Sequence, residues 1–156
     1  MASFQIVGLS PEPFASLFAL TDLELAERGA LRVVAKERGS YPCRVSLVDA
    51  EIGEELLLLP YCHQPAKTPY NASGPIYIRN SAQQRILEPG RVPECVGRRL
   101  ISVRAYDAGH MIIDADVCDG QSVAVEIEHQ FNNAQVRYIH LHNAKRGCYS
   151  CLVRRR

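Results

Sequence analysis

The residues with the clearest chemical potential lie in one short segment near the C-terminus. His140 and His142 are separated by one residue, and Cys148 and Cys151 by two. Two imidazoles and two thiolates are a donor set that tetrahedral zinc accepts. The five residues between His142 and Cys148 are fewer than usually separate two metal-binding pairs, so hydrogen-bonded histidines and core thiols are the competing interpretation. No cofactor is assigned, and zinc is the first to test.

A second interpretation makes Cys148 a catalytic nucleophile. The nearby Arg146 would favour its thiolate form, and His142 or His140 could accept the proton. His63, from a distant segment, is a possible third participant. No local signature of a known thiol hydrolase surrounds the cysteine, so the alternative is a buried thiol that only packs.

A third interpretation is recognition of a small anion. An arginine fork combined with imidazole suits a carboxylate or a phosphate. The competing view is that each arginine is a surface or structural ion-pair partner. The candidate ligand-binding residues are Arg44, His63, Arg79, Arg146 and Asn143.

A smaller polar group lies beside an expected hairpin. Leu100–Tyr106 and Met111–Val117 alternate between apolar and polar residues and are joined by a turn-forming Asp-Ala-Gly. His110, Asp114 and Asp116 would share one face there. Acid–base or metal chemistry is conceivable for them, but a hydrophilic outer face explains them equally well.

The histidines need a strand to position them. Val136–His142 predicts one, and alternate residues of a strand face the same side. His140 and His142 would therefore project together, with Ile139 and Leu141 on the opposite face. Further strands are expected at Phe4–Val7, Leu31–Ala35, Tyr41–Val48, Leu56–Tyr61, Ile76–Arg79 and Tyr149–Val153.

Helical signals are fewer. Val123, Ile127 and Phe131 recur at a four-residue interval typical of an amphipathic helix. Phe14–Leu20 allows one or two helical turns, and Thr21 with Glu24 forms a capping-box pattern at the start of another helix. We therefore expect an α+β protein: a single domain over residues 1–156, with a mostly antiparallel β-sheet of about eight strands and about three helices.

The longest irregular segment is expected at residues 62–74. Pro65, Pro69 and Pro75 argue against a helix or a central strand there. Loops of this length without secondary structure are uncommon and often functional. This loop is therefore a candidate wall of a binding site.

Composition narrows the function class. The chain has 156 residues and a net charge of +1, which favours one domain and gives no electrostatic basis for binding nucleic acid or membrane. The first twenty residues lack the pattern of a signal peptide, and no apolar run approaches the roughly 20 residues of a membrane span. We expect a cytoplasmic protein with reduced cysteines and a disordered basic tail at residues 154–156.

Four segments resemble an uncharacterised bacterial family catalogued as a domain of unknown function. They are Phe14–Leu20, Tyr41–Leu47 (YPCRVSL), Gly74–Arg79 and His140–Tyr149 (HLHNAKRGCY). The resemblance spans nearly the whole chain and implies a small cytosolic single-domain protein, without an activity to transfer. The family pattern includes the thiol at Cys148 but none at Cys151, which weakens the four-ligand zinc interpretation.

The function is therefore unknown from sequence, and three hypotheses remain. The leading one is a pocket built from the long loop, the Tyr41–Arg44 segment and the His140–Cys148 segment, which binds a small anionic ligand or acts on it as an enzyme. The second is a non-catalytic interaction module, for instance a homodimer formed through an apolar sheet face. The third is zinc binding.

Overall fold

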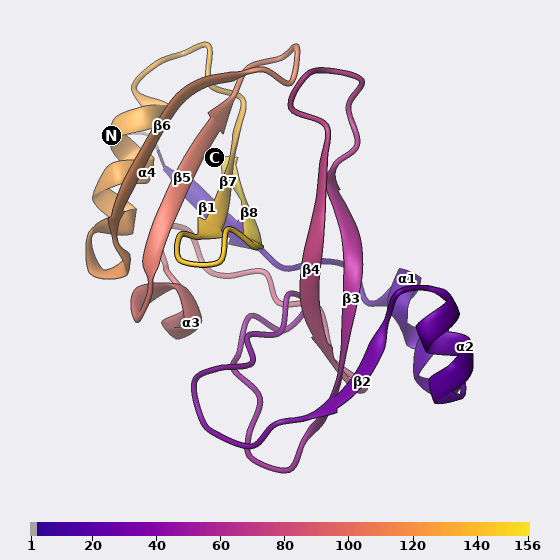
Figure 1. Ribbon diagram of the computed structural model, residues 1–156. Helices are drawn as coiled ribbons and strands as arrows, with labels where there is room; N and C mark the ends of the chain where they lie inside the picture. The colour runs from indigo at the N-terminus through magenta and orange to yellow at the C-terminus, as the bar shows by residue number, and fades with distance from the viewer. Residues whose placement is uncertain (1–2) are drawn as a thin grey trace.

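The computed structural model describes residues 3–156, which form eight β-strands and four α-helices (Figure 1). The strands are β1 (Phe4–Val7), β2 (Leu31–Val34), β3 (Glu55–Gln64), β4 (Ala72–Arg79), β5 (Leu100–Tyr106), β6 (Ile112–Asp119), β7 (Tyr138–Asn143) and β8 (Tyr149–Arg155). The helices are α1 (Glu12–Ala15), α2 (Asp22–Glu27), α3 (Glu94–Gly97) and α4 (Val123–Phe131). The predicted α+β class and the number of strands are confirmed.

The strands are divided between two sheets. Five strands form one sheet in the order β1-β8-β7-β5-β6, and three form the other in the order β2-β3-β4. All neighbouring strands are antiparallel. In Figure 1 the smaller sheet stands beside the larger one, with β3 and β4 next to β7 and β8.

One face of the five-stranded sheet is covered by α4 (Figure 1). Val123, Ile127 and Phe131 are almost completely buried against Ile139 and Leu141 of β7. Burying each such side chain contributes about 1.5–3 kcal/mol. The predicted amphipathic helix is therefore confirmed, and it leaves the opposite face of β7 available for polar residues.

The smaller sheet has its own apolar core. Phe14 from α1 and Leu25 from α2 pack on Leu57 and Leu59 of β3. The predicted capping box begins α2: the Glu24 amide donates to Thr21 Oγ1 at 3.2 Å, and the Thr21 amide donates to Glu24 Oε2 at 2.8 Å. This core holds β3 in place beside the larger sheet.

Two sequence predictions are wrong, one about a strand and one about the length of a loop. Tyr41–Val48 is not a strand but a turn-rich segment with two isolated bridges, because the chain reverses at Leu47, whose φ is +54°. The predicted 62–74 loop is shorter, since β3 continues to Gln64 and β4 begins at Ala72. Pro75 is compatible with β4 because β4 is an edge strand. The N–H that proline lacks would have no second neighbouring strand to which it could donate.

The basic C-terminal residues also differ from the prediction. Arg154 and Arg155 are part of β8 and pair with β1. The Arg155 guanidinium donates to the carbonyl groups of Phe131, Asn133 and Val136 at 2.8–3.0 Å. These two residues are thus ordered strand residues rather than a disordered tail.

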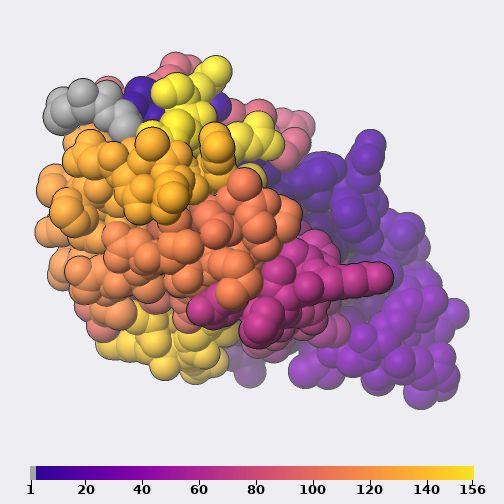
Figure 2. Space-filling model, turned by 90° about the horizontal axis from the view of Figure 1, so that it is seen from above, coloured from indigo at the N-terminus to yellow at the C-terminus, as the bar shows by residue number. Residues whose placement is uncertain are grey.

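Two hairpin tips meet at one end of the molecule. The β3–β4 tip and the β5–β6 tip lie together at the top of Figure 1 and touch in the view of Figure 2. Thr68 Oγ1 donates to the His110 carbonyl oxygen at 3.5 Å across this contact. Within residues 3–156, the helices are all too short or too polar to cross a membrane.

Candidate functional site

Three histidines come together between the two sheets. His140 and His142 project from the same face of β7, as predicted, and His63 reaches them from β3, where the strand register shifts between Cys62 and Gln64. The ring centroids of His63 and His142 are 4.8 Å apart, those of His63 and His140 6.1 Å, and those of His140 and His142 6.3 Å. We call these three residues the histidine cluster.

Tyr149 of β8 completes the packing of this cluster. Its ring stacks on His63 with centroids 5.4 Å apart and an interplanar angle of 10°. It meets His140 and His142 edge to face at 5.2 and 5.8 Å. The three imidazoles are therefore packed against an aromatic ring rather than surrounded by water.

The histidine cluster contains unpaired polar atoms. Nδ1 of His63, Nδ1 of His140 and Nε2 of His142 are buried with no hydrogen-bond partner in the described part of the chain. His142 Nδ1 lies 2.9 Å from the Gly147 carbonyl oxygen, which makes this nitrogen the N–H donor. Each unpaired buried group costs about 1–3 kcal/mol, so packing alone does not explain the cluster.

The histidines are held in their neutral form. Burial, with smaller contributions from the neighbouring imidazoles and Arg104, lowers the pKa of His140 to about 3. Burial likewise lowers the pKa of His142 to about 4, against the opposing effect of the Gly147 carbonyl. Burial and Arg104 also lower the pKa of His63. At neutral pH the cluster is therefore uncharged.

Two arginines near the cluster have no acidic partner. Arg104 of β5 lies opposite His140 in the strand register, and its Nε donates to Ser102 Oγ at 3.1 Å. Arg44 is buried, and its guanidinium donates to the carbonyl oxygens of Tyr149 at 2.7 Å and Pro42 at 2.5 Å. Burial lowers the Arg44 pKa. Neither arginine forms an ion pair with a carboxylate of residues 3–156.

A groove of about 560 Å³ opens beside the cluster. We call it the histidine groove, and its walls come from the end of β3, the β5–β6 tip, β7 and β8. The Tyr138 hydroxyl accepts from Gln64 Nε2 at 2.9 Å and lies 2.7 Å from His110 Nδ1, so the phenol is fixed at the wall. The lining residues are His63, Gln64, Pro65, Ala66, His110, Tyr138, His140, Leu152 and Arg154.

The structure separates the predicted arginines. Arg44 lies near the histidine cluster, since it contributes to lowering the His142 pKa. Arg79 is instead paired with Glu54, through contacts of 2.5 and 2.8 Å, and lies outside the groove lining. Arg146 is exposed in the turn between β7 and β8. The buried Oδ1 of Asn143 has no hydrogen-bond partner within residues 3–156, and the backbone N–H of Asn143 donates to the Cys148 carbonyl oxygen at 2.9 Å.

The four residues of the zinc hypothesis are not assembled. Cys151 pairs with Leu141 and is buried in the core on the α4 side of the sheet, away from the face that bears His140 and His142. Among residues 3–156, no group of three or more histidine, cysteine or acidic side chains has an arrangement that would hold a metal ion. The Cys148–Cys151 spacing therefore does not create a joint site with the histidines. The register of β7 and β8 shifts between Leu141 and His142, so Cys151 faces the core while Tyr149 faces the histidines.

Cys148 is half-buried and directly precedes β8. It lies close enough to Arg44 to raise that guanidinium's pKa slightly, against the larger lowering by burial. Within the described residues, its thiol has no hydrogen bond to His140 or His142. The geometry does not pair this thiol with a histidine base.

Several residues of the site cannot be identified from the sequence alone. Tyr138, Tyr149 and Gln64 are common residue types without a motif, and their role depends on which strands become neighbours. The position of Arg104 could be predicted from sequence, because it lies between the apolar residues Val103 and Ala105, which are buried. Alternation therefore places Arg104 on the polar face of β5. His110 faces Tyr138 rather than sharing a strand face with the exposed Asp114 and Asp116.

Together these features define an α+β protein with two antiparallel sheets and a basic, histidine-lined groove between them. Residues 40–155 match the family described as "Protein of unknown function (DUF1203)", and the chain belongs to this family. The resemblance to a family of unknown function is thereby confirmed. No curated protein and no solved structure matches the chain.

Proposed function

We propose that this protein binds a small anionic ligand in the histidine groove. The observation that carries the proposal is the charge pattern: two arginines that form no ion pair within residues 3–156 lie close to three packed imidazoles, and two of these imidazoles, His63 and His140, line an open groove. No acidic side chain lines that groove or contributes to the pKa shifts of the three histidines.

The electrostatic argument starts from the cost of burial. A buried guanidinium normally has an acidic partner, because charge is expensive to remove from water. Arg44 has carbonyl oxygens instead, and Arg104 has a hydroxyl. The resulting positive potential remains uncompensated, and a cleft with one sign of charge attracts ligands of the opposite sign.

The dimensions support a small molecule. A volume of about 560 Å³ lies within the range of typical ligand sites, roughly 300–1,000 Å³. The walls belong to strands of both sheets and to two hairpin tips in contact, so the groove is largely preformed. A binding role requires no catalytic partner for Cys148.

The histidine rings provide the test. We would label the five histidines isotopically and follow their ring resonances by NMR while adding acetate, inorganic phosphate or 3-phenylpropanoate. Binding in the groove should shift His63 and His140. His129, exposed on α4 on the other side of the sheet, is the internal control and should not move.

A matched pair of variants sharpens this test. Arg104→Gln should weaken any response of the cluster, because it removes a charge close to all three rings. Arg91→Gln removes an exposed arginine outside the groove lining and should leave the response unchanged. If none of the three anions moves the His63 or His140 resonances, the proposal is wrong.

A further inference from the structure

We propose that the ligand of the histidine groove is an amphiphilic monoanion: a flat, apolar body, such as an aromatic ring, that carries a single carboxylate. This inference rests on the proposed function and specifies its ligand class. It follows from how apolar surface, ring edges and charge are distributed over the walls of the groove.

The apolar part of the ligand is indicated by the walls. Four rings border the groove, from His63, His110, Tyr138 and His140, and Leu152 lies beside His140 in the strand register. The rings already contact one another in tilted or edge-to-face geometry, with centroids of Tyr138 and His140 5.3 Å apart. Another flat ring can join such a cluster in offset or edge-to-face packing.

The single negative charge is indicated by Arg154. It is the one charged side chain in the lining and forms no ion pair with residues 3–156. Arg154 lies beside Tyr138 in the strand register and is exposed, which places its cation at the rim. One guanidinium fork matches one carboxylate through two parallel hydrogen bonds.

The spacing along β8 joins these two parts. Leu152 and Arg154 are two residues apart on one face of the strand, so their backbones are about 6–7 Å apart. A ligand whose ring contacts Leu152 can therefore place an acid group on Arg154. This separation favours a ring and a carboxylate connected by a short chain over a bare ion.

Polyhydroxylated or multiply charged ligands fit the groove less well. Gln64 Nε2 and the Tyr138 hydroxyl are already hydrogen-bonded to each other, and the hydroxyl also contacts His110. A sugar would leave many hydroxyl groups unpaired against Pro65, Ala66 and Leu152, and each such loss is costly. An inorganic ion would leave most of the volume without contacts.

Calorimetry with four probes tests the ligand class. The probes are 3-phenylpropanoate, its neutral amide, propanoate without the ring, and inorganic phosphate. We expect 3-phenylpropanoate to bind at least about tenfold more tightly than the other three, since each lacks one of the two recognition elements, and tenfold corresponds to about 1.4 kcal/mol.

Two arginines at the end of the chain provide matched variants. Arg154→Gln should reduce the affinity for 3-phenylpropanoate about tenfold and leave that for the amide unchanged. Arg156→Gln removes a neighbouring exposed arginine outside the groove lining and should have no effect. Thermal unfolding of both variants would establish that the fold is intact.

The outcomes separate this inference from the proposed function. Equal or tighter binding of propanoate or phosphate would overturn the amphiphilic ligand while leaving an anion site. Equal binding of the amide, or an unchanged affinity in Arg154→Gln, would overturn the role assigned to the carboxylate. If no probe binds and no histidine resonance moves, both proposals fail.

Discussion

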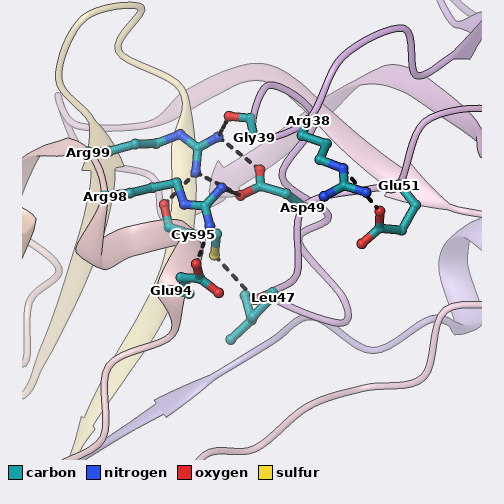
Figure 3. A network of polar contacts seen from close by, with 9 residues as sticks. All are labelled: Arg38, Gly39, Leu47, Asp49, Glu51, Glu94, Cys95, Arg98 and Arg99. Carbon is teal, nitrogen blue, oxygen red and sulfur yellow. Dashed lines mark hydrogen bonds and ion pairs between the residues drawn. The ribbon is translucent and has the colours of Figure 1, made fainter.

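Two clusters of partly buried arginines in this protein are built on opposite plans. The first joins the 39–50 segment to α3: Asp49 accepts from Arg99 Nη2 at 2.8 Å and pairs with Arg98 at 3.4 Å (Figure 3). Arg99 also donates to the carbonyl oxygens of Gly39 and Cys95 at 2.6 and 2.5 Å. The second is the histidine cluster with Arg44 and Arg104, where no carboxylate of residues 3–156 forms an ion pair with either cation.

Of these two polar regions, the Asp49 network is the one that stabilises the fold. In the Asp49 network, an acid and several carbonyl groups satisfy the guanidinium groups, so each member supports the others. In the histidine cluster, three ring nitrogens are buried and have no hydrogen-bond partner among residues 3–156. Apolar side chains of similar shape would stabilise that position better, so the presence of polar residues there supports the proposed binding role.

The largest expected effect comes from breaking the satisfied network. Asp49→Ala leaves Arg98 and Arg99 without their shared acceptor, and removal of one partner from a buried pair costs about 3–5 kcal/mol. Chemical denaturation measures this as a loss of unfolding free energy. Glu51→Ala is the control, because its contact with Arg38 is 3.9 Å long and exposed, and such pairs contribute about 0–1 kcal/mol. Equal costs for the two variants would contradict the distinction.

Acid should destabilise the protein through the histidine cluster. His140 and His142 have folded-state pKa values of about 3 and 4, whereas an unfolded histidine titrates near 6.5. The unfolded chain therefore binds more protons between pH 6.5 and 4, and stability present above pH 6.5 is lost as the pH falls. Between pH 7 and pH 5 the loss should be on the order of 3 kcal/mol for both residues together.

Denaturation curves at pH 7 and pH 5 would measure this loss. The variant His142→Phe should remove about half of the pH dependence, since one of the two buried imidazoles no longer titrates in the unfolded chain. The exposed His129 is the matched control, and His129→Phe should leave the pH dependence unchanged. A pH-independent stability in the unmodified protein would refute the neutral, buried state of the cluster.

A smaller effect, a gain rather than a loss of unfolding free energy, is expected when a histidine is replaced without loss of packing. His140→Phe keeps a flat ring against Tyr149 and Tyr106 and removes the unpaired Nδ1. Because an unpaired buried group costs about 1–3 kcal/mol, the variant should be as stable as the original or about 1 kcal/mol more stable. Denaturation at pH 7 tests this, and a loss of several kcal/mol would show that His140 is needed for folding.

The sequence allows the local features of this site to be predicted. The alternation in β7 places His140 and His142 together, and the four-residue spacing of Val123 and Ile127 identifies α4. Both signals depend on neighbours within a few residues, where the geometry of a strand or a helix decides the outcome.

The rest of the site depends on contacts between distant segments. His63 meets β7 because β3 packs beside the larger sheet, and no periodicity records that pairing. Arg44 is brought inward by a chain reversal at Leu47, whose positive φ is uncommon for a branched residue. Cys151 is lost from the predicted metal set because an irregularity in the pairing of β7 with β8 places it on the core face, opposite to Tyr149. Such features are set by tertiary packing rather than by local pattern.

The smallest expected effect compares one arginine from each region. Arg104→Gln removes a cation whose one side-chain hydrogen-bond partner within residues 3–156 is the Ser102 hydroxyl, so stability at neutral pH should change by less than about 0.5 kcal/mol. It should also raise the pKa of the three histidines, because Arg104 lowers each of them. Arg99→Gln, by contrast, breaks bonds to Asp49, Gly39 and Cys95 and should cost several times more. Histidine titrations and denaturation of both variants would test this comparison. If Arg104→Gln lowers the unfolding free energy as much as Arg99→Gln does, both arginine clusters stabilise the fold.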